Sequence, residues 1–193
     1  LDGAGRDAWA SLPLFPAGIA PEGPLRAAAG KNGPMALREA ALADFDPENQ
    51  VWQWHATVAE YASRHWPLSQ KDRRLRLMGL AAAWKGWLDR LSSREMGISR
   101  IEDVHLNLRA MVEACAEGHC PDCPPFLEAL KRELPLPDRT LILRELIAEV
   151  CEARLKTAQP DEIEVKAGRL SDLGYAFSAL GRREEALAPA QEA

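Results

Sequence analysis

The sequence predicts a mostly α-helical protein with a small subdomain at its start, which contains a β-hairpin, and an αα-hairpin at its end. Three observations support this prediction. Short helical segments precede two short apolar strands near residue 50. Apolar residues after residue 55 recur at helical spacing. The last segment places small residues and a glycine where two helices would cross closely. We expect domain boundaries that divide the chain into residues 1–66, 67–158 and 159–193.

The first unit is expected to hold three short helices and then the hairpin. Helices are predicted at residues 1–12, 21–29 and 34–41, with an apolar linker at 14–19. The segments 42–45 and 51–54 flank a loop of turn-forming residues and are expected to pair as strands. Three short helices followed by a β-hairpin is the element order of a winged helix, so we expect a winged-helix subdomain.

From His55 onward the sequence predicts only helices. One covers residues 55–65, and the next begins at Ser69, whose hydroxyl can cap the first turn. The apolar residues of that second helix recur every three or four positions and predict one continuous buried stripe: Leu77, Ala81, Trp84, Leu88 and Leu91. Further helices are expected at 99–117, 124–134 and 138–157, the last with Asp138 as its N-cap.

Residues 170–193 predict an αα-hairpin that is cut off before its second helix is finished. Gly174, Ala186 and Ala190 are small enough for a close helix crossing, and Gly181 suits the turn. A single hairpin of this kind cannot bury its own apolar face, so such hairpins occur in stacks. We therefore expect a tetratricopeptide-like (TPR-like) repeat that opens a longer array, and a chain that is a slice of a larger protein.

Composition narrows the class of protein. The 193 residues carry a net charge of −5, and no apolar run approaches the roughly 20 residues that span a bilayer. Leu1 opens no recognisable signal peptide, and four cysteines do not indicate a disulfide framework, so we expect a cytoplasmic protein that does not bind membranes. The basic run Lys71, Arg73, Arg74 and Arg76 is interpreted as a solvated helix face.

Nucleic-acid binding is not expected. The predicted recognition helix, residues 34–41, offers one basic residue, Arg38, beside the acidic Glu39. Residues 1–50 hold four basic against seven acidic side chains. DNA affinity depends largely on neutralising phosphates with Lys and Arg, and this region is poorly suited to that.

Four residues in one predicted turn could serve as metal ligands: Cys115, His119, Cys120 and Cys123. The Cys-x-x-Cys spacing can place two thiolates on one zinc ion, but structural sites usually pair two such knuckles. Cys151 is a possible further ligand. The alternatives are a disulfide within the cluster, or free thiols at a helix–helix turn, which the sequence favours.

His55 lies where a strand passes directly into a helix. The first helical amides are unpaired there and the helix dipole is positive, so a side chain at this position can meet an anion such as phosphate. The residue types alone favour a simpler role, in which His55 caps or packs at the junction.

The run 54–62 (Trp-His-Ala-Thr-Val-Ala-Glu-Tyr-Ala) resembles the end of the winged-helix domain in STAND-class, apoptotic-ATPase-like nucleotide switches. Residues 8–19 resemble that domain's opening helix and turn. The resemblance implies that His55 contacts the phosphates of bound ADP and holds the switch closed. It also implies an upstream nucleotide-binding domain in the same chain for ATP or ADP, and a protein or peptide ligand on the repeats. Ala56 replaces the usual aspartate, which weakens the implied closing contact.

The residues indicate no catalysis within this chain. No Gly-x-x-x-x-Gly-Lys-Ser/Thr loop occurs, and Gly30-Lys31 lacks the preceding glycine and the following hydroxyl. We therefore expect a regulatory and sensor fragment rather than an enzyme. The alternative is a helical TPR-containing interaction scaffold that is unrelated to nucleotide switching.

Overall fold

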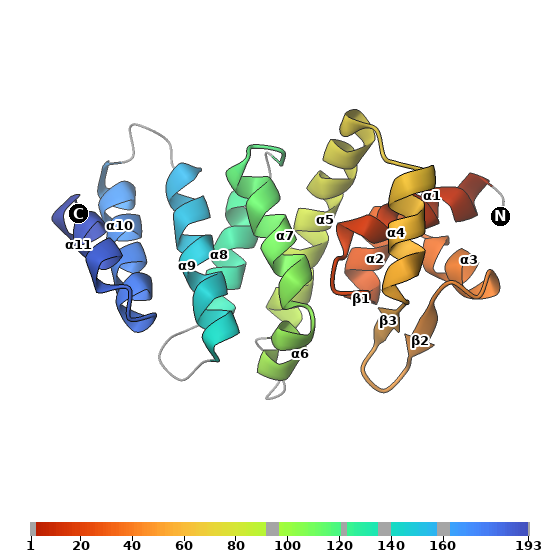
Figure 1. Ribbon diagram of the computed structural model, residues 1–193, viewed down its shortest axis with the longest axis horizontal. Helices are drawn as coiled ribbons and strands as arrows, with labels where there is room; N and C mark the ends of the chain where they lie inside the picture. Colours follow the sequence, from red (N-terminus) through yellow and green to blue (C-terminus); the bar gives the residue numbers. More distant parts are fainter. Residues whose placement is uncertain (1–2, 92–96, 121–122, 135–139, 158–162, 193) are drawn as a thin grey trace.

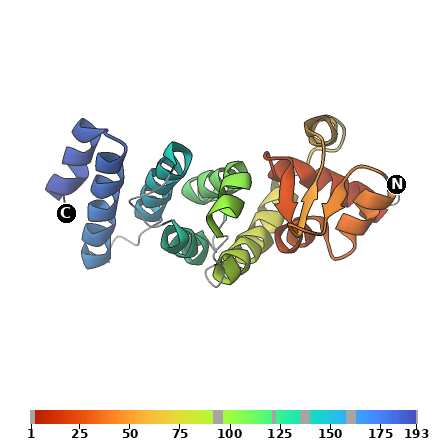
Figure 2. The same ribbon diagram turned by 90° about the horizontal axis from the view of Figure 1, so that it is seen from below.

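Helices and one small antiparallel sheet make up the computed structural model, which describes residues 3–91, 97–120, 123–134, 140–157 and 163–192. The mostly helical fold and the presence of a small sheet are confirmed. Figure 1 shows the helices standing side by side in an elongated row, with the two ends of the chain at opposite ends of the row. Figure 2 shows the same row from below.

The sheet and the helices around it occupy the N-terminal end of the row. Its elements are, in order, α1 (Gly3–Ser11), a 3₁₀ turn (Leu12–Leu14), β1 (Ile19–Pro21), α2 (Glu22–Ala29), α3 (Gly33–Glu39), β2 (Asp44–Asp46), β3 (Val51–Gln53) and α4 (Ala56–His65). The strand order is β1-β3-β2, with both neighbours antiparallel to β3. The predicted hairpin is therefore present as β2 and β3, with Phe45 opposite Trp52.

The strand β1 corrects an expectation. Residues 14–19 were expected to form only a linker, but Ile19–Pro21 pairs with β3, with Ile19 opposite Gln53. The amide of Trp54 donates to the Gly18 carbonyl at 2.9 Å, which extends the pairing by one bond. A three-residue strand next to proline and glycine has no room for an alternating pattern, so the sequence could not reveal it.

The elements that the structure describes in the rest of the row are helices: α5 (Gln70–Leu91), α6 (Gly97–Asp103), α7 (His105–Ala116), α8 (Cys123–Glu133), α9 (Leu141–Lys156), α10 (Ile163–Ala179) and α11 (Arg183–Glu192). The helix α5 packs against α2 on one side and α8 on the other, and so joins the two parts of the row. The apolar stripe predicted for α5 is confirmed, because Leu77, Ala81, Trp84, Leu88 and Leu91 are all buried.

Two predicted helix boundaries are wrong. The single helix expected at 99–117 is divided at Val104 into α6 and α7. Near this break, Asn107 is 2% exposed and ties α7 to the N-terminal part: its Nδ2 donates to the Ile19 carbonyl at 2.6 Å, and its Oδ1 accepts from the Ala17 amide at 2.8 Å. The helix α9 begins at Leu141 with Thr140 at its N-cap position; Asp138, the predicted N-cap, lies outside the described residues.

The helices α10 and α11 form the αα-hairpin predicted at the C-terminal end. Gly181 adopts φ +74°, and the Arg182 amide donates to the Phe177 carbonyl at 3.0 Å, which closes a glycine-terminated helix end. Gly174 and Ala186 are buried, as a close helix crossing requires. The side chain of Ala190 lies outside the described residues. Among the helices that the structure describes, none is both long and apolar enough to cross a membrane.

Candidate functional site

His55 occupies the N-cap of α4, one residue after the end of the sheet segment. Its backbone is extended (φ −73°, ψ 142°), and its Nδ1 accepts a hydrogen bond from the Thr57 amide at 3.3 Å. The same Nδ1 lies 2.8 Å from Thr57 Oγ1. The side chain is exposed. The capping role that the residue types favour is therefore present in this geometry.

The cap has a consequence for the other ring nitrogen. In a neutral imidazole one nitrogen accepts and the other carries the proton, so an accepting Nδ1 places the proton on Nε2. Within the described chain no group accepts a hydrogen bond from His55 Nε2. His55 therefore offers an N–H donor at a positive helix end, which is a suitable arrangement for meeting an anion.

The position of α4, and so of His55, is fixed by Trp9 on α1. Trp9 Nε1 donates to the Val58 carbonyl at 2.8 Å, and its ring stacks on Tyr61 at a centroid distance of 5.4 Å. Trp66 closes the aromatic cluster at 4.8 Å from Trp9. No local pattern in the sequence predicts these contacts, because Trp9 and Val58 lie 49 positions apart. Thr57, which orients the imidazole, lies only two positions after His55 and could have been named from the sequence as its capping partner.

The cysteine cluster is oxidised in this structure. Cys115 at the end of α7 and Cys123 at the start of α8 form a disulfide, so the free thiols that the sequence favours are wrong for these two residues and the disulfide alternative is present. His119 Nδ1 lies 3.0 Å from Glu117 Oε2, and Cys120 is buried. The four predicted zinc ligands are thus not gathered on one point, and among the described residues no group of three or more His, Cys, Asp or Glu side chains could hold a metal ion.

Zinc binding remains a prediction for the reduced chain, in which Cys115 and Cys123 would be thiols. Cys151, considered as a further ligand, is buried in α9, and burial raises the pKa of its thiol to about 11. To bind zinc, this thiol would have to lose its proton, because zinc binds the thiolate.

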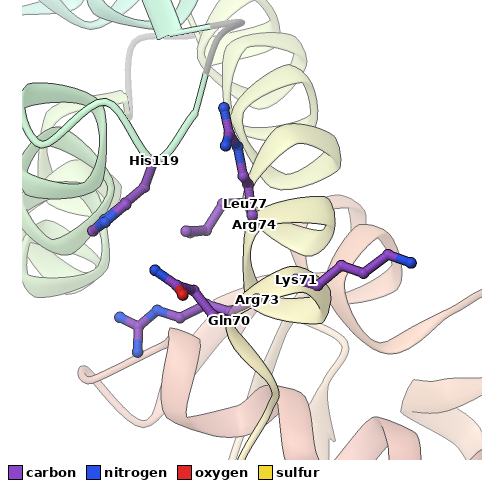
Figure 3. Close-up of a pocket in the computed structure, with 6 residues that line it drawn as sticks. All are labelled: Gln70, Lys71, Arg73, Arg74, Leu77 and His119. Carbon is purple, nitrogen blue, oxygen red and sulfur yellow. The ribbon is translucent and has the colours of Figure 1, made fainter.

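A basic cleft lies between the first turns of α5 and the turn that follows α7. It has a volume of about 600 Å³ and is lined by Gln70, Lys71, Arg73, Arg74, Leu77 and His119. Figure 3 shows Gln70, Arg73 and Leu77 projecting toward the side where His119 lies, while Lys71 points away. The sequence indicated only a solvated basic face, because the second wall comes from a residue more than 40 positions away.

Comparison of the chain with protein-family models, with curated proteins and with solved structures gave no match. The function must therefore be argued from the geometry of His55, the cysteine turn and the basic cleft.

Proposed function

We propose that this chain is the regulatory and sensor segment of a STAND-type nucleotide-switch signalling protein. It mediates autoinhibition and protein interaction and catalyses no reaction by itself. The observation that carries the proposal is the geometry at His55: Nδ1 caps the N-terminus of α4, the side chain is exposed, and Nε2–H has no acceptor among the described residues. That is the arrangement which a phosphate sensor requires.

The order of the N-terminal elements supports the same proposal. A helix, a strand, two helices and a two-stranded hairpin follow one another in the order α1, β1, α2, α3, β2, β3, and β1 pairs with the far strand of the hairpin. This is the order expected of a winged helix, with β2 and β3 as its wing. Residues 54–62, which carry the resemblance to STAND proteins, follow directly after β3.

In the proposed closed state, His55 Nε2–H donates to a phosphate oxygen of ADP, which is held by a nucleotide-binding domain of the same protein upstream of this chain. Ala56 supplies no carboxylate, so His55 alone makes this contact from the junction. A protein or peptide ligand on the TPR-like helices binds the open state more tightly. The ligand opens the switch by as much as its affinities for the two states differ.

The first test is the reading frame upstream of Leu1, in which the proposal expects a phosphate-binding loop within a few hundred codons. The second is His55→Ala in the full-length protein. Loss of the phosphate contact should raise the fraction of assembled or active protein without ligand, measured by size-exclusion chromatography and a downstream activity assay.

His65→Ala is the matched control for that substitution. His65 ends the same helix, is also exposed, and packs on Tyr61 rather than facing the start of α4. The control should leave the basal state unchanged. Equal basal states in the wild type and in His55→Ala would contradict the proposal.

The second candidate function is a helical interaction scaffold with no link to nucleotide. The observation that favours it is the exposure of large apolar side chains on the last hairpin, Tyr175 at 60% and Leu187 at 59%. Exposed apolar groups on adjacent helices can receive a partner. A full-length protein that has no phosphate-binding loop and retains no nucleotide would favour this scaffold function.

A further inference from the structure

We propose that the basic cleft between α5 and the turn after α7 binds a small phosphate-bearing molecule. This inference does not depend on the nucleotide switch, because the cleft and His55 lie on different elements. The ligand expected is a phosphate ester whose organic part rests against Leu77. The described side chains that line the cleft belong to α5 and to the turn after α7.

The cations on the first turns of α5 have no carboxylate partner among the residues that the structure describes. Lys71, Arg73 and Arg74 are exposed, and none of them forms an ion pair with a carboxylate of the described residues. Some arginines elsewhere in the described chain are paired: Arg132 with Asp89 at 2.7 Å, and Arg154 with Glu128 at 2.8 Å. Lys71 points away from the cleft, but Arg73 and Arg74 both line it, and a bound dianion would relieve the repulsion between them.

The nearby carboxylates are already engaged elsewhere. Asp72 lies in the same first turn of α5, but its Oδ2 accepts from Ser69 Oγ at 2.6 Å as part of the helix cap. Glu117 lies 3.0 Å from His119 Nδ1, so it attracts that ring rather than α5. No described acidic side chain lines the cleft itself.

The volume of the cleft suits a small organic phosphate. Small-molecule sites have volumes of about 300–1,000 Å³, and the cleft's 600 Å³ falls within that range. A lone phosphate would leave most of the space empty. Leu77 is buried at 4% exposure and contributes a small apolar part of the lining beside the cations. Arg73 offers the planar fork of donors that matches phosphate oxygens.

The two walls are held in place before any ligand binds. Cys120 Sγ donates to the Leu77 carbonyl at 3.8 Å, which ties the turn after α7 to α5. The Cys115–Cys123 disulfide brackets the same turn, and Gly118 with φ +73° forms its bend. A preformed site loses less entropy on binding than one that must be assembled.

The test titrates phenyl phosphate and, separately, inorganic phosphate into the chain at low ionic strength, with binding followed by calorimetry. Phenyl phosphate should bind at one site, and more tightly than inorganic phosphate. Arg73→Gln/Arg74→Gln should weaken binding by at least about tenfold, since two charge-assisted contacts are lost. The affinity of Arg73→Lys/Arg74→Lys should lie between those of the wild type and the glutamine variant, because lysine keeps the positive charge but lacks the planar fork of donors.

Arg38→Gln on α3 is the matched control, since it removes one exposed charge far from the cleft. Both arginine variants should keep the wild-type circular dichroism spectrum and melting temperature, because the altered side chains are exposed. Three results would overturn the proposal: no saturable binding up to about 10 mM phenyl phosphate, an equal loss in Arg38→Gln, or tighter binding of a hexaglutamate peptide at the same residues.

Discussion

The two ends of the helical row hold their elements together by different means. Around the sheet the contacts are apolar: Phe15 is fully buried and meets the Trp54 ring edge-on at 5.9 Å. Between α8, α9 and α10 a charged cluster adds to an apolar core that includes Leu130, Val150 and Phe177. Arg154, 8% exposed, binds both oxygens of Glu128 at 2.8 and 3.0 Å and Asp172 at 2.9 Å.

This difference indicates which end of the molecule should respond to changes in pH and salt concentration. Apolar burial is nearly independent of pH and salt at constant temperature. Ion pairs weaken when salt screens them or when a carboxylate takes up a proton. We therefore expect the sheet region to stay rigid while the packing of α10 on α8 and α9 is conditional. In the proposed switch, the conditional part is the one that receives the ligand.

The largest effect should come from the apolar end. Phe15→Ala should cost about 3–5 kcal/mol of unfolding free energy, because it empties a fully buried site. The loss should be the same in low and high salt. Urea denaturation at both salt concentrations measures it. Met35→Ala, at a side chain that is 46% exposed, is the control and should change stability by less than about 0.5 kcal/mol.

The next largest effect on stability should come from the disulfide between α7 and α8. Cys115→Ser/Cys123→Ser should lower stability by about 2–3 kcal/mol, because the disulfide closes a short loop of sequence separation 8. Reductant should cause the same loss in the wild type and no further loss in the double variant. Metal analysis of the reduced wild type then tests zinc: near-stoichiometric zinc would support the four predicted ligands, and a folded, metal-free protein would count against them.

The ion pairs of Asp172 should make the stability of the folded protein depend on pH. Burial alone would raise the pKa of Asp172, but hydrogen bonds from Lys131 and Arg154 outweigh it and hold this pKa below the ordinary value of 3.8. A lowered carboxyl pKa stabilises the folded state above pH 4, and this stability is lost as the pH falls through the folded-state pKa.

Asp172→Asn should therefore cost about 1 kcal/mol at pH 7, a small value because one third of the side chain is exposed. It should also flatten the fall in stability below pH 4. Thermal melts from pH 7 to pH 2.5 measure both effects, with the exposed Asp44→Asn as the control. Parallel pH curves for Asp172→Asn and the wild type would show that the charges do not hold α10.

The smallest effect should be a gain near the sheet. Ala41 ends α3 with φ +55°, and the Leu42 amide donates to the Leu37 carbonyl at 2.9 Å, which is a helix end that glycine usually forms. Ala41→Gly should stabilise the protein by about 1 kcal/mol by removing this strain. Ala40→Gly, one residue earlier at φ −84°, should give no gain. A loss in Ala41→Gly would contradict this account of the helix end.

The same two regions show how far the sequence can predict the fold. Periodicity located α5 and its buried stripe, because a long amphipathic helix repeats its signal many times. It missed β1, which exists only through pairing with a strand more than 30 positions later. Periodicity also missed the break at Val104 and the role of Asn107. The side-chain amide of Asn107 binds two backbone groups that are distant in the sequence, and such contacts produce no pattern among neighbouring residues.

The candidate sites show the same difference between features set by neighbouring residues and features set by distant ones. The position of His55 at a strand–helix junction could be read from the sequence, because adjacent residues define it. Its orientation could be read only in part, since that depends on the neighbouring Thr57 but also on the packing of α4 against Trp9. The basic run on α5 was visible, but the cleft required His119 from another helix end. Sequence reasoning thus finds groups that are close along the chain and misses the surfaces that folding brings to them.

The most direct test of the central claim is the rate at which a fluorescent ADP analogue dissociates from the full-length protein. The wild type, His55→Ala and His65→Ala are compared at equal loading. We predict that His55→Ala releases the analogue at least about tenfold faster, as expected when a charge-assisted contact to phosphate is lost, and that His65→Ala matches the wild type. Equal rates in all three proteins would contradict a phosphate-sensing role for His55.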